Sequence, residues 1–319
     1  MPAPSDEPTP PPPAATVRPV ATERVPSTDG VVLALHDLGG SGPTVLFCHP
    51  TGFLGMTWAP LAAALADRAH CWALDFRGHG DSTLPGPASL DWQHMADDVL
   101  AVVDHLDATP LYGVGHSMGG AALALTEELR PGLWAGLWFY EPILFPRFDG
   151  ESTPIRPDRS SEIRPDAGSL PQPATNPMAN GARRRKAVFP DRATARLNYS
   201  SKLPLRVLHP AALDAYVAYG FRDRSDGSVE LKCDPEVEAR TFEGSGGGHD
   251  IFAGLGSVRC PTTVAAGGDG SPPARMAPLV AEALPHGRFE RMAQLTHFGP
   301  MEDPAAVAAS IAPILTADL

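Results

Sequence analysis

The chain has little of three things that would each point to a particular setting. No run of about 18 or more apolar residues occurs, so no segment is predicted to span a membrane. Only four cysteines are present, without a C-x-x-C pair or a histidine and cysteine cluster of ligand spacing, so we expect no metal site. Basic residues are outnumbered, 25 against 37 acidic ones, and the net charge of −12 argues against a nucleic-acid partner.

The N-terminus also lacks the apolar core of a secretory signal. Its first 20 residues are rich in proline and are expected to form a disordered tail (1–20). Three of the four cysteines flank or lie in predicted strands, where a reduced thiol behaves as a small apolar group. Together these features predict a cytoplasmic protein with reduced thiols.

What the chain does have is apolar sequence, 43% of its residues, enough for a large core. Residues 21–38 alternate in character around Asp29-Gly30 and predict a β-hairpin. Residues 44–145 then alternate strands with helices, for example a helix from Met95 to Leu106. Such alternation predicts a mainly parallel sheet with helices on both faces.

The alternation breaks over residues 146–254. A stretch rich in proline, serine and arginine precedes three helical segments, predicted at 182–198, 209–221 and 234–242. We therefore expect one core built from 21–145 and 255–319, with 146–254 inserted as a cap. The cap's aromatic side chains mostly pack it on the core, and one or two line an apolar pocket. Its basic run, residues 183–186, predicts a solvated helix face, with an anion clamp as the alternative.

One hexapeptide, Gly115-His116-Ser117-Met118-Gly119-Gly120, carries most of the functional information. It follows an apolar run and precedes a helical stretch, which is the strand, G-x-S-x-G, helix pattern of a nucleophile elbow. Glycines on either side allow a turn too sharp for side chains, and the helix N-terminus favours developing negative charge. Ser117 is the predicted nucleophile.

Three further segments fit the same interpretation. The strand at 45–48 ends in His49-Pro50-Thr51-Gly52, and the backbone N–H groups of Thr51 and Met118 are predicted to hold an oxyanion. The strand and loop at 73–82 are expected to brace the site without a catalytic role. His297 lies on a loop between a strand at 288–292 and a terminal helix at 304–315, as expected for the base of a triad.

Together these motifs resemble the α/β-hydrolase fold superfamily. Residues 49–58 resemble its oxyanion segment, with Pro50 in place of the usual glycine. Residues 75–82 resemble D-x-R-G-H-G-x-S, and residues 115–120 resemble G-H-S-M-G-G. The resemblance implies a mostly parallel eight-stranded sheet flanked by helices, with an inserted, mainly helical cap and no cofactor.

The resemblance also implies an acid after a strand in the last third of the chain. Asp269, in the loop after the strand at 260–266, is the predicted acid. Its surroundings depart from the usual G-x-x-D pattern, because Ala266 stands where a glycine is expected. Glu141 ends an earlier strand and is the alternative acid.

We therefore predict a serine hydrolase that forms an acyl-enzyme, most plainly on carboxylic esters of small to medium apolar substrates. A serine nucleophile disfavours the dehalogenases and epoxide hydrolases of the same fold, which use a carboxylate. Hydrolysis of C–C bonds and perhydrolysis use the same triad and stay open. A ligand-binding protein with an idle triad is the alternative from another class. The partner is then a small molecule, and the oligomeric state is left open.

Overall fold

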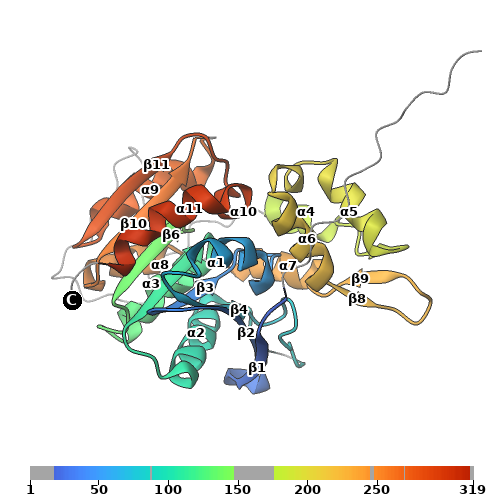
Figure 1. Ribbon diagram of the computed structural model, residues 1–319, viewed down its shortest axis with the longest axis horizontal. Helices are drawn as coiled ribbons and strands as arrows, with labels where there is room; N and C mark the ends of the chain where they lie inside the picture. The colour runs from blue at the N-terminus through green and yellow to red at the C-terminus, as the bar shows by residue number, and fades with distance from the viewer. Residues whose placement is uncertain (1–17, 87, 147–175, 245–247, 269, 317–319) are drawn as a thin grey trace, which may run out of the picture.

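The computed structural model describes residues 18–86, 88–146, 176–244, 248–268 and 270–316. At its centre is an eight-stranded sheet (Figure 1) with the order β1-β2-β4-β3-β5-β6-β10-β11. The strands of this sheet are β1 (Ala21–Pro26), β2 (Val32–Gly40), β3 (Thr44–Cys48), β4 (His70–Asp75), β5 (Leu111–His116), β6 (Gly136–Tyr140), β10 (Thr262–Gly267) and β11 (Gly287–Met292).

Pairing within the sheet is mostly parallel, as predicted. The first two strands form the expected antiparallel hairpin, with Pro26 opposite Val32, and β2 continues antiparallel to β4. All remaining pairs, from β4 across to β11, are parallel. The carboxyl ends of β3, β5, β6 and β10 therefore meet at one edge of the sheet, which is where open α/β sheets bind ligands.

Helices cover both faces of the sheet and produce two hydrophobic cores. Successive residues of β6 alternate between them: Leu137 and Phe139 belong to one core, Trp138 and Tyr140 to the other. The helices of this part are α1 (Ala59–Leu65), α2 (Trp92–Leu106), α3 (Met118–Leu129), α8 (Gly248–Gly254), α9 (Pro272–Ala283), α10 (Gly299–Glu302) and α11 (Pro304–Ile311).

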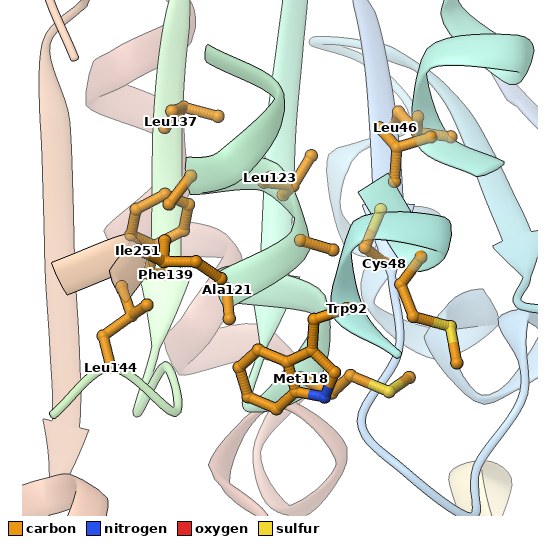
Figure 2. Packing of buried hydrophobic residues seen from close by; sticks show 14 of the residues in the cluster. Leu46, Cys48, Trp92, Met118, Ala121, Leu123, Leu137, Phe139, Leu144 and Ile251 are labelled. Atoms are coloured by element: carbon orange, nitrogen blue, oxygen red, sulfur yellow. The ribbon is translucent and has the colours of Figure 1, made fainter. Parts of the chain in front are cut away.

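The first core fixes the position of α3, the helix that follows the predicted nucleophile. Figure 2 shows Ala121 and Leu123 of this helix among the side chains of β3 and β6, such as Cys48 and Phe139. All of these side chains are buried. Burying a large aliphatic or aromatic side chain contributes about 1.5–3 kcal/mol. Packing of α3 in this core therefore also fixes the position of its first residues.

The segment between β6 and α8, called the inserted segment below, lies to one side of the large sheet (Figure 1). Its second and third predicted helices correspond to α6 and α7, but the first is interrupted by a short strand. Pro190 follows that strand, and Asp191 caps a new helix by accepting from the Thr194 N–H. The elements are α4 (Pro177–Arg183), β7 (Val188–Phe189), α5 (Arg192–Ser200), α6 (Pro210–Tyr219), β8 (Phe221–Asp223), β9 (Val229–Leu231) and α7 (Pro235–Glu243).

A three-stranded antiparallel sheet, β7-β9-β8, joins these helices, and the sequence analysis did not predict it. The segment packs on the second core: Phe53 and Tyr216 have ring centroids 5.4 Å apart. Most of the predicted tail (1–17) and residues 245–247 of the predicted glycine-rich connector lie outside the described residues.

Two general expectations can be compared with the described part of the chain. In it, no helix is long and apolar enough to cross a membrane. The same residues contain no group of three or more histidine, cysteine or acidic side chains arranged to hold a metal ion. All four cysteines are buried and form no disulfide.

Candidate active site

Ser117 stands on a sharp turn between β5 and α3. Its backbone has φ 55° and ψ −115°. A positive φ is energetically unfavourable for an L-residue with a side chain, and such strained residues cluster at functional sites. The turn is held by packing of both elements and by the Ser117 N–H, which donates to the Tyr140 carbonyl at 3.0 Å. The geometry is that of the strand, turn and helix predicted from the hexapeptide.

The two glycines around Ser117 are required by close backbone approach. A Cβ on Gly119 would lie 2.1 Å from the Cys48 carbonyl oxygen, and one on Gly115 would lie 2.6 Å from the Gly120 nitrogen. Real Cβ atoms do not approach backbone so closely, so both positions exclude a side chain. The elbow can therefore lie against the end of β3, where the predicted oxyanion loop begins.

His297 pairs with Glu141, the alternative acid of the sequence analysis. The histidine lies on the loop between β11 and α10, and its Nδ1 is 2.6 Å from Glu141 Oε2. Glu141 follows β6 directly, at φ 42°, and its side chain is fully buried. A buried carboxylate at this distance fixes the imidazole with the Nδ1 proton toward the acid, leaving Nε2 as the basic nitrogen.

Two residues near Asp269 in the chain donate hydrogen bonds to Glu141. The Gly267 N–H donates to Oε1 at 2.9 Å, and the Ser271 hydroxyl donates to Oε2 at 2.6 Å. Burial alone raises the pKa of Glu141. The hydrogen bonds from His297, Ser271 and Gly267 outweigh it and hold this pKa below its ordinary value. Glu141 is thus an ionised, fully satisfied carboxylate.

Asp269, the predicted acid, lies outside the described residues, so its role stays a prediction. The residues flanking it are described, and one of them, Ser271, begins α9 as its N-cap. Neither Gly267 nor Ser271 was singled out by the sequence analysis. A glycine-rich turn and a serine before a proline pair gave no distinct signal of hydrogen bonding to a distant glutamate.

His116 adjoins His297, with 4.9 Å between the ring centroids, yet it does not compete as a base. Burial, helped by the neighbouring imidazole, holds the pKa of His116 well below its ordinary value. Its ring packs edge-on against Tyr140, which itself donates to the Thr296 carbonyl at 2.6 Å. His116 therefore acts as packing beneath the loop that carries His297.

The predicted oxyanion loop is held by His49. The Phe76 N–H donates to His49 Nε2 at 3.0 Å, so the ring proton is on Nδ1 and is donated to the Pro50 carbonyl at 2.8 Å. Burial lowers the pKa of His49 to about 3, so the ring stays neutral. One backbone carbonyl next to Thr51 is thereby fixed.

Thr51 and Met118, the two predicted oxyanion donors, are neighbours. The Thr51 hydroxyl lies 3.4 Å from Met118 Sδ, which brings the loop after β3 to the start of α3. On its other side the loop contacts the inserted segment, where the Tyr216 hydroxyl donates to the Gly52 carbonyl at 3.3 Å. Arg185 in turn donates to that hydroxyl at 2.5 Å and forms an ion pair with Glu238.

The loop after β4 braces the site, as expected. Asp75 accepts from the Gly55 N–H at 2.6 Å and the Asp81 N–H at 2.7 Å. Arg77 is fully buried and forms a two-pronged ion pair with Asp98, with nitrogen–oxygen distances of 2.7 and 2.8 Å. These side chains lie beneath the surface and do not line the cavity described next.

A cavity of about 640 Å³ opens beside Ser117 and His297. Its walls come from the oxyanion loop, the loop after β11 and the inserted segment. Arg183 is exposed and paired with Glu236, as a solvated helix face requires, whereas the rest of its basic run lines the cavity. The lining residues are Pro50, Thr51, Phe53, Ser117, Pro177, Met178, Gly181, Ala182, Arg184, Arg185, Lys186, Asn198, Tyr199, Lys202, Leu203, Pro204, Leu205, Tyr216, Glu238, Phe242, His297 and Phe298.

More aromatic side chains of the inserted segment line the cavity than the one or two expected from the sequence. Tyr199, Tyr216 and Phe242 line it. Phe189 and Phe221 are buried and pack edge-on, with ring centroids 5.8 Å apart. The cavity wall is therefore partly aromatic.

The chain is similar to known proteins over most of its length. The sequence profile of the Alpha/beta hydrolase family matches residues 45–310. Over 99 residues the chain is 39% identical to protein phosphatase methylesterase 1 of Homo sapiens, which covers 30% of this chain and 26% of that protein. The match thus spans only about a quarter of the relative's length.

Solved structures extend the similarity to nearly the whole chain at the level of the fold. E-2-(Acetamidomethylene)succinate hydrolase superposes with a TM-score of 0.71 at 18% identity, covering 93% of this chain and 99% of that one. A thermophilic esterase from Thermogutta terrifontis gives 0.63 at 23% identity, covering 93% and 98%.

Proposed function

The chain belongs to the alpha/beta hydrolase family, and we propose that it is a serine hydrolase with Ser117 as nucleophile, His297 as base and Glu141 as acid. One observation carries this proposal. The elbow serine and the loop histidine line one cavity, and Nδ1 of the histidine is hydrogen-bonded to a buried carboxylate. Glu141 takes the role that the sequence analysis gave to Asp269.

In the proposed reaction, His297 Nε2 accepts the hydroxyl proton as Ser117 Oγ attacks the carbonyl carbon of an ester. The imidazolium formed is stabilised by Glu141, which stays ionised. The tetrahedral intermediate collapses, the leaving alcohol takes the proton from Nε2, and an acyl-enzyme forms on Ser117. A water that gives its proton to His297 then attacks the acyl carbon. The bond to Ser117 Oγ breaks, His297 returns the proton to that oxygen, and the acid leaves.

The backbone N–H groups of Thr51 and Met118 are the proposed oxyanion donors. Their neighbourhood in space and the fixed Pro50 carbonyl support this assignment. Met118 is also the first residue of α3, so the positive end of that helix adds to the stabilisation. Losing one such donor typically costs about 3–4 kcal/mol in the barrier.

The inserted segment is the proposed cap, because it supplies more than half of the residues that line the cavity. Its apolar and aromatic lining favours esters of small to medium size with an apolar part. The volume of about 640 Å³ lies within the usual range of ligand pockets. Carboxylester hydrolysis is therefore the reaction that we propose.

The proposal is tested by ester turnover with the wild type and Ser117→Ala. We expect the wild type to hydrolyse 4-nitrophenyl butyrate and the variant to lose about 10⁶-fold in kcat, as in other serine hydrolases that lose the nucleophile. Circular dichroism serves as the folding control. Turnover in Ser117→Ala equal to the wild type would refute the mechanism.

A further inference from the structure

The cavity beside Ser117 has an unusual charge for this protein. Its lining includes four cationic side chains and a single carboxylate, Glu238, although the chain as a whole carries a net charge of −12. The whole sequence contains only three lysines, at 186, 202 and 232, and two of them line this cavity. Positive charge is therefore concentrated where a substrate would enter.

Two arginines of the basic run are compensated within the protein. Arg183 lies outside the lining, and its guanidinium pairs with Glu236 at 2.8 Å and with Glu243 at 2.7 Å. Arg185 lines the cavity, but its charge is matched by the ion pair with Glu238. Neither arginine leaves a net charge for a ligand.

The other three cations of the lining have no acidic partner among the described residues. The Lys202 ammonium donates to the neutral amide oxygen of Asn198 at 2.7 Å, and the Lys186 ammonium lies 4.6 Å from the ring centroid of Phe189. Within the part of the chain that the structure describes, no carboxylate lies within ion-pair distance of Arg184, Lys186 or Lys202. All three are exposed to solvent.

Apolar side chains line the same cavity as these cations. Met178 and Leu203 are among them and are 60% and 65% exposed. Phe242 of α7 lines it as well. A ligand that contacts this lining meets apolar surface and unpaired positive charge together.

We propose that the ester cleaved at Ser117 carries a carboxylate, which Arg184, Lys186 and Lys202 bind while its apolar chain contacts the side chains between them. This inference rests on the proposed serine hydrolase function and narrows its substrate to monoesters of dicarboxylic acids and similar anionic esters. A guanidinium and two ammonium groups that line one cavity suit a carboxylate, because the planar fork of an arginine can donate two parallel hydrogen bonds.

A matched pair of substrates tests the proposal. Monoethyl adipate carries a carboxylate at the far end of its acyl chain, and ethyl hexanoate has the same chain length without the charge. We expect the wild type to favour the anionic ester by roughly 10-fold or more in kcat/KM at low salt, as a few exposed ion pairs provide. The preference should shrink between about 0.01 M and 1 M salt, because exposed charges are then screened.

Variants locate the effect. The triple variant Arg184→Gln, Lys186→Gln, Lys202→Gln should lose the preference, because its kcat/KM falls more on monoethyl adipate than on ethyl hexanoate. The control variant loses three positive charges as well, but at exposed arginines outside the lining. It should keep the preference for monoethyl adipate. Its substitutions are Arg206→Gln, Arg240→Gln and Arg259→Gln.

The outcomes separate this inference from the function on which it rests. Hydrolysis of ethyl hexanoate at least as fast as monoethyl adipate would overturn the anionic substrate and leave the serine hydrolase intact. Equal loss of preference in both triple variants would assign it to net charge and would also overturn the proposal. No turnover of either ester by the wild type would refute the hydrolase function and this inference with it.

Discussion

Replacing Glu141 by glutamine tests the acid that orients His297. Glu141 has one oxygen on the Gly267 N–H and the other on His297 Nδ1 and the Ser271 hydroxyl. Glutamine has only one acceptor oxygen and one NH₂ group. If the oxygen keeps the hydrogen bond from the Gly267 N–H, the NH₂ group faces His297 Nδ1 and favours the tautomer whose proton is on Nε2. If the oxygen keeps the hydrogen bond from His297, the NH₂ group faces the Gly267 N–H, and two donors then point at each other.

The first arrangement removes the basic lone pair from Nε2, and the second destabilises the loop that holds the site. The carboxylate is fully buried, so water cannot replace its hydrogen bonds. We expect Glu141→Gln to lower kcat by about 10⁴-fold, or about 5 kcal/mol in the barrier, the size seen when a triad aspartate becomes asparagine in other enzymes. Steady-state hydrolysis of 4-nitrophenyl butyrate at neutral pH measures it.

Asp269→Asn is the matched control, since it makes the same chemical change at the acid predicted from the sequence. We expect its kcat to stay within a few-fold of the wild type. A wild-type kcat in Glu141→Gln together with a large loss in Asp269→Asn would refute the assignment of Glu141. Circular dichroism of both variants checks that the fold is intact.

Three other substitutions are expected to have measurable effects. Gly119→Ala should destabilise the fold by about 1–3 kcal/mol in thermal unfolding, because its Cβ would lie 2.1 Å from a carbonyl oxygen; Gly181→Ala, whose Cβ meets no atom within 4 Å, is the control, and equal melting temperatures would contradict the steric argument. Tyr216→Phe removes the hydroxyl that donates to the oxyanion loop and should lower kcat by up to about 10-fold, the worth of one ordinary hydrogen bond; an unchanged kcat would show that this contact does not position the loop. Burial raises the pKa of Glu128 from 4.5 to about 8, so the folded state binds its proton more tightly than the unfolded state and stability falls as pH rises through that interval. Glu128→Gln should therefore melt higher than the wild type above pH 8 and equally below the unfolded pKa, whereas a difference independent of pH would contradict the shift.

Much of the fold follows from local sequence. The hexapeptide around Ser117 predicts strand, turn and helix because close backbone approach excludes side chains at Gly115 and Gly119. The alternation over 44–145 predicts a parallel sheet because strands such as β5 are buried throughout. By contrast, β7 has only two residues and gains its stability from pairing with β9, which no local pattern contains.

The pairing of Glu141 with His297 depends on contacts that sequence separation hides. The two residues are 156 positions apart, and the sequence has a candidate acid after each of two strands, β6 and β10, that are neighbours in the sheet. The hydrogen bonds to Glu141 come from the loop after β10 itself. Only the three-dimensional arrangement shows that this loop donates hydrogen bonds to Glu141, the carboxylate that follows the neighbouring strand β6.

The most direct test of the central claim is labelling with a fluorophosphonate, followed by intact mass, for the wild type beside Ser117→Ala. An activated serine attacks the phosphorus, loses its proton to His297 and expels fluoride, which leaves one stable adduct. We expect one adduct on the wild type and none on the variant. A folded wild type that acquires no adduct, or a variant labelled equally, would contradict the assignment of Ser117 as nucleophile and favour a ligand-binding protein with an idle triad.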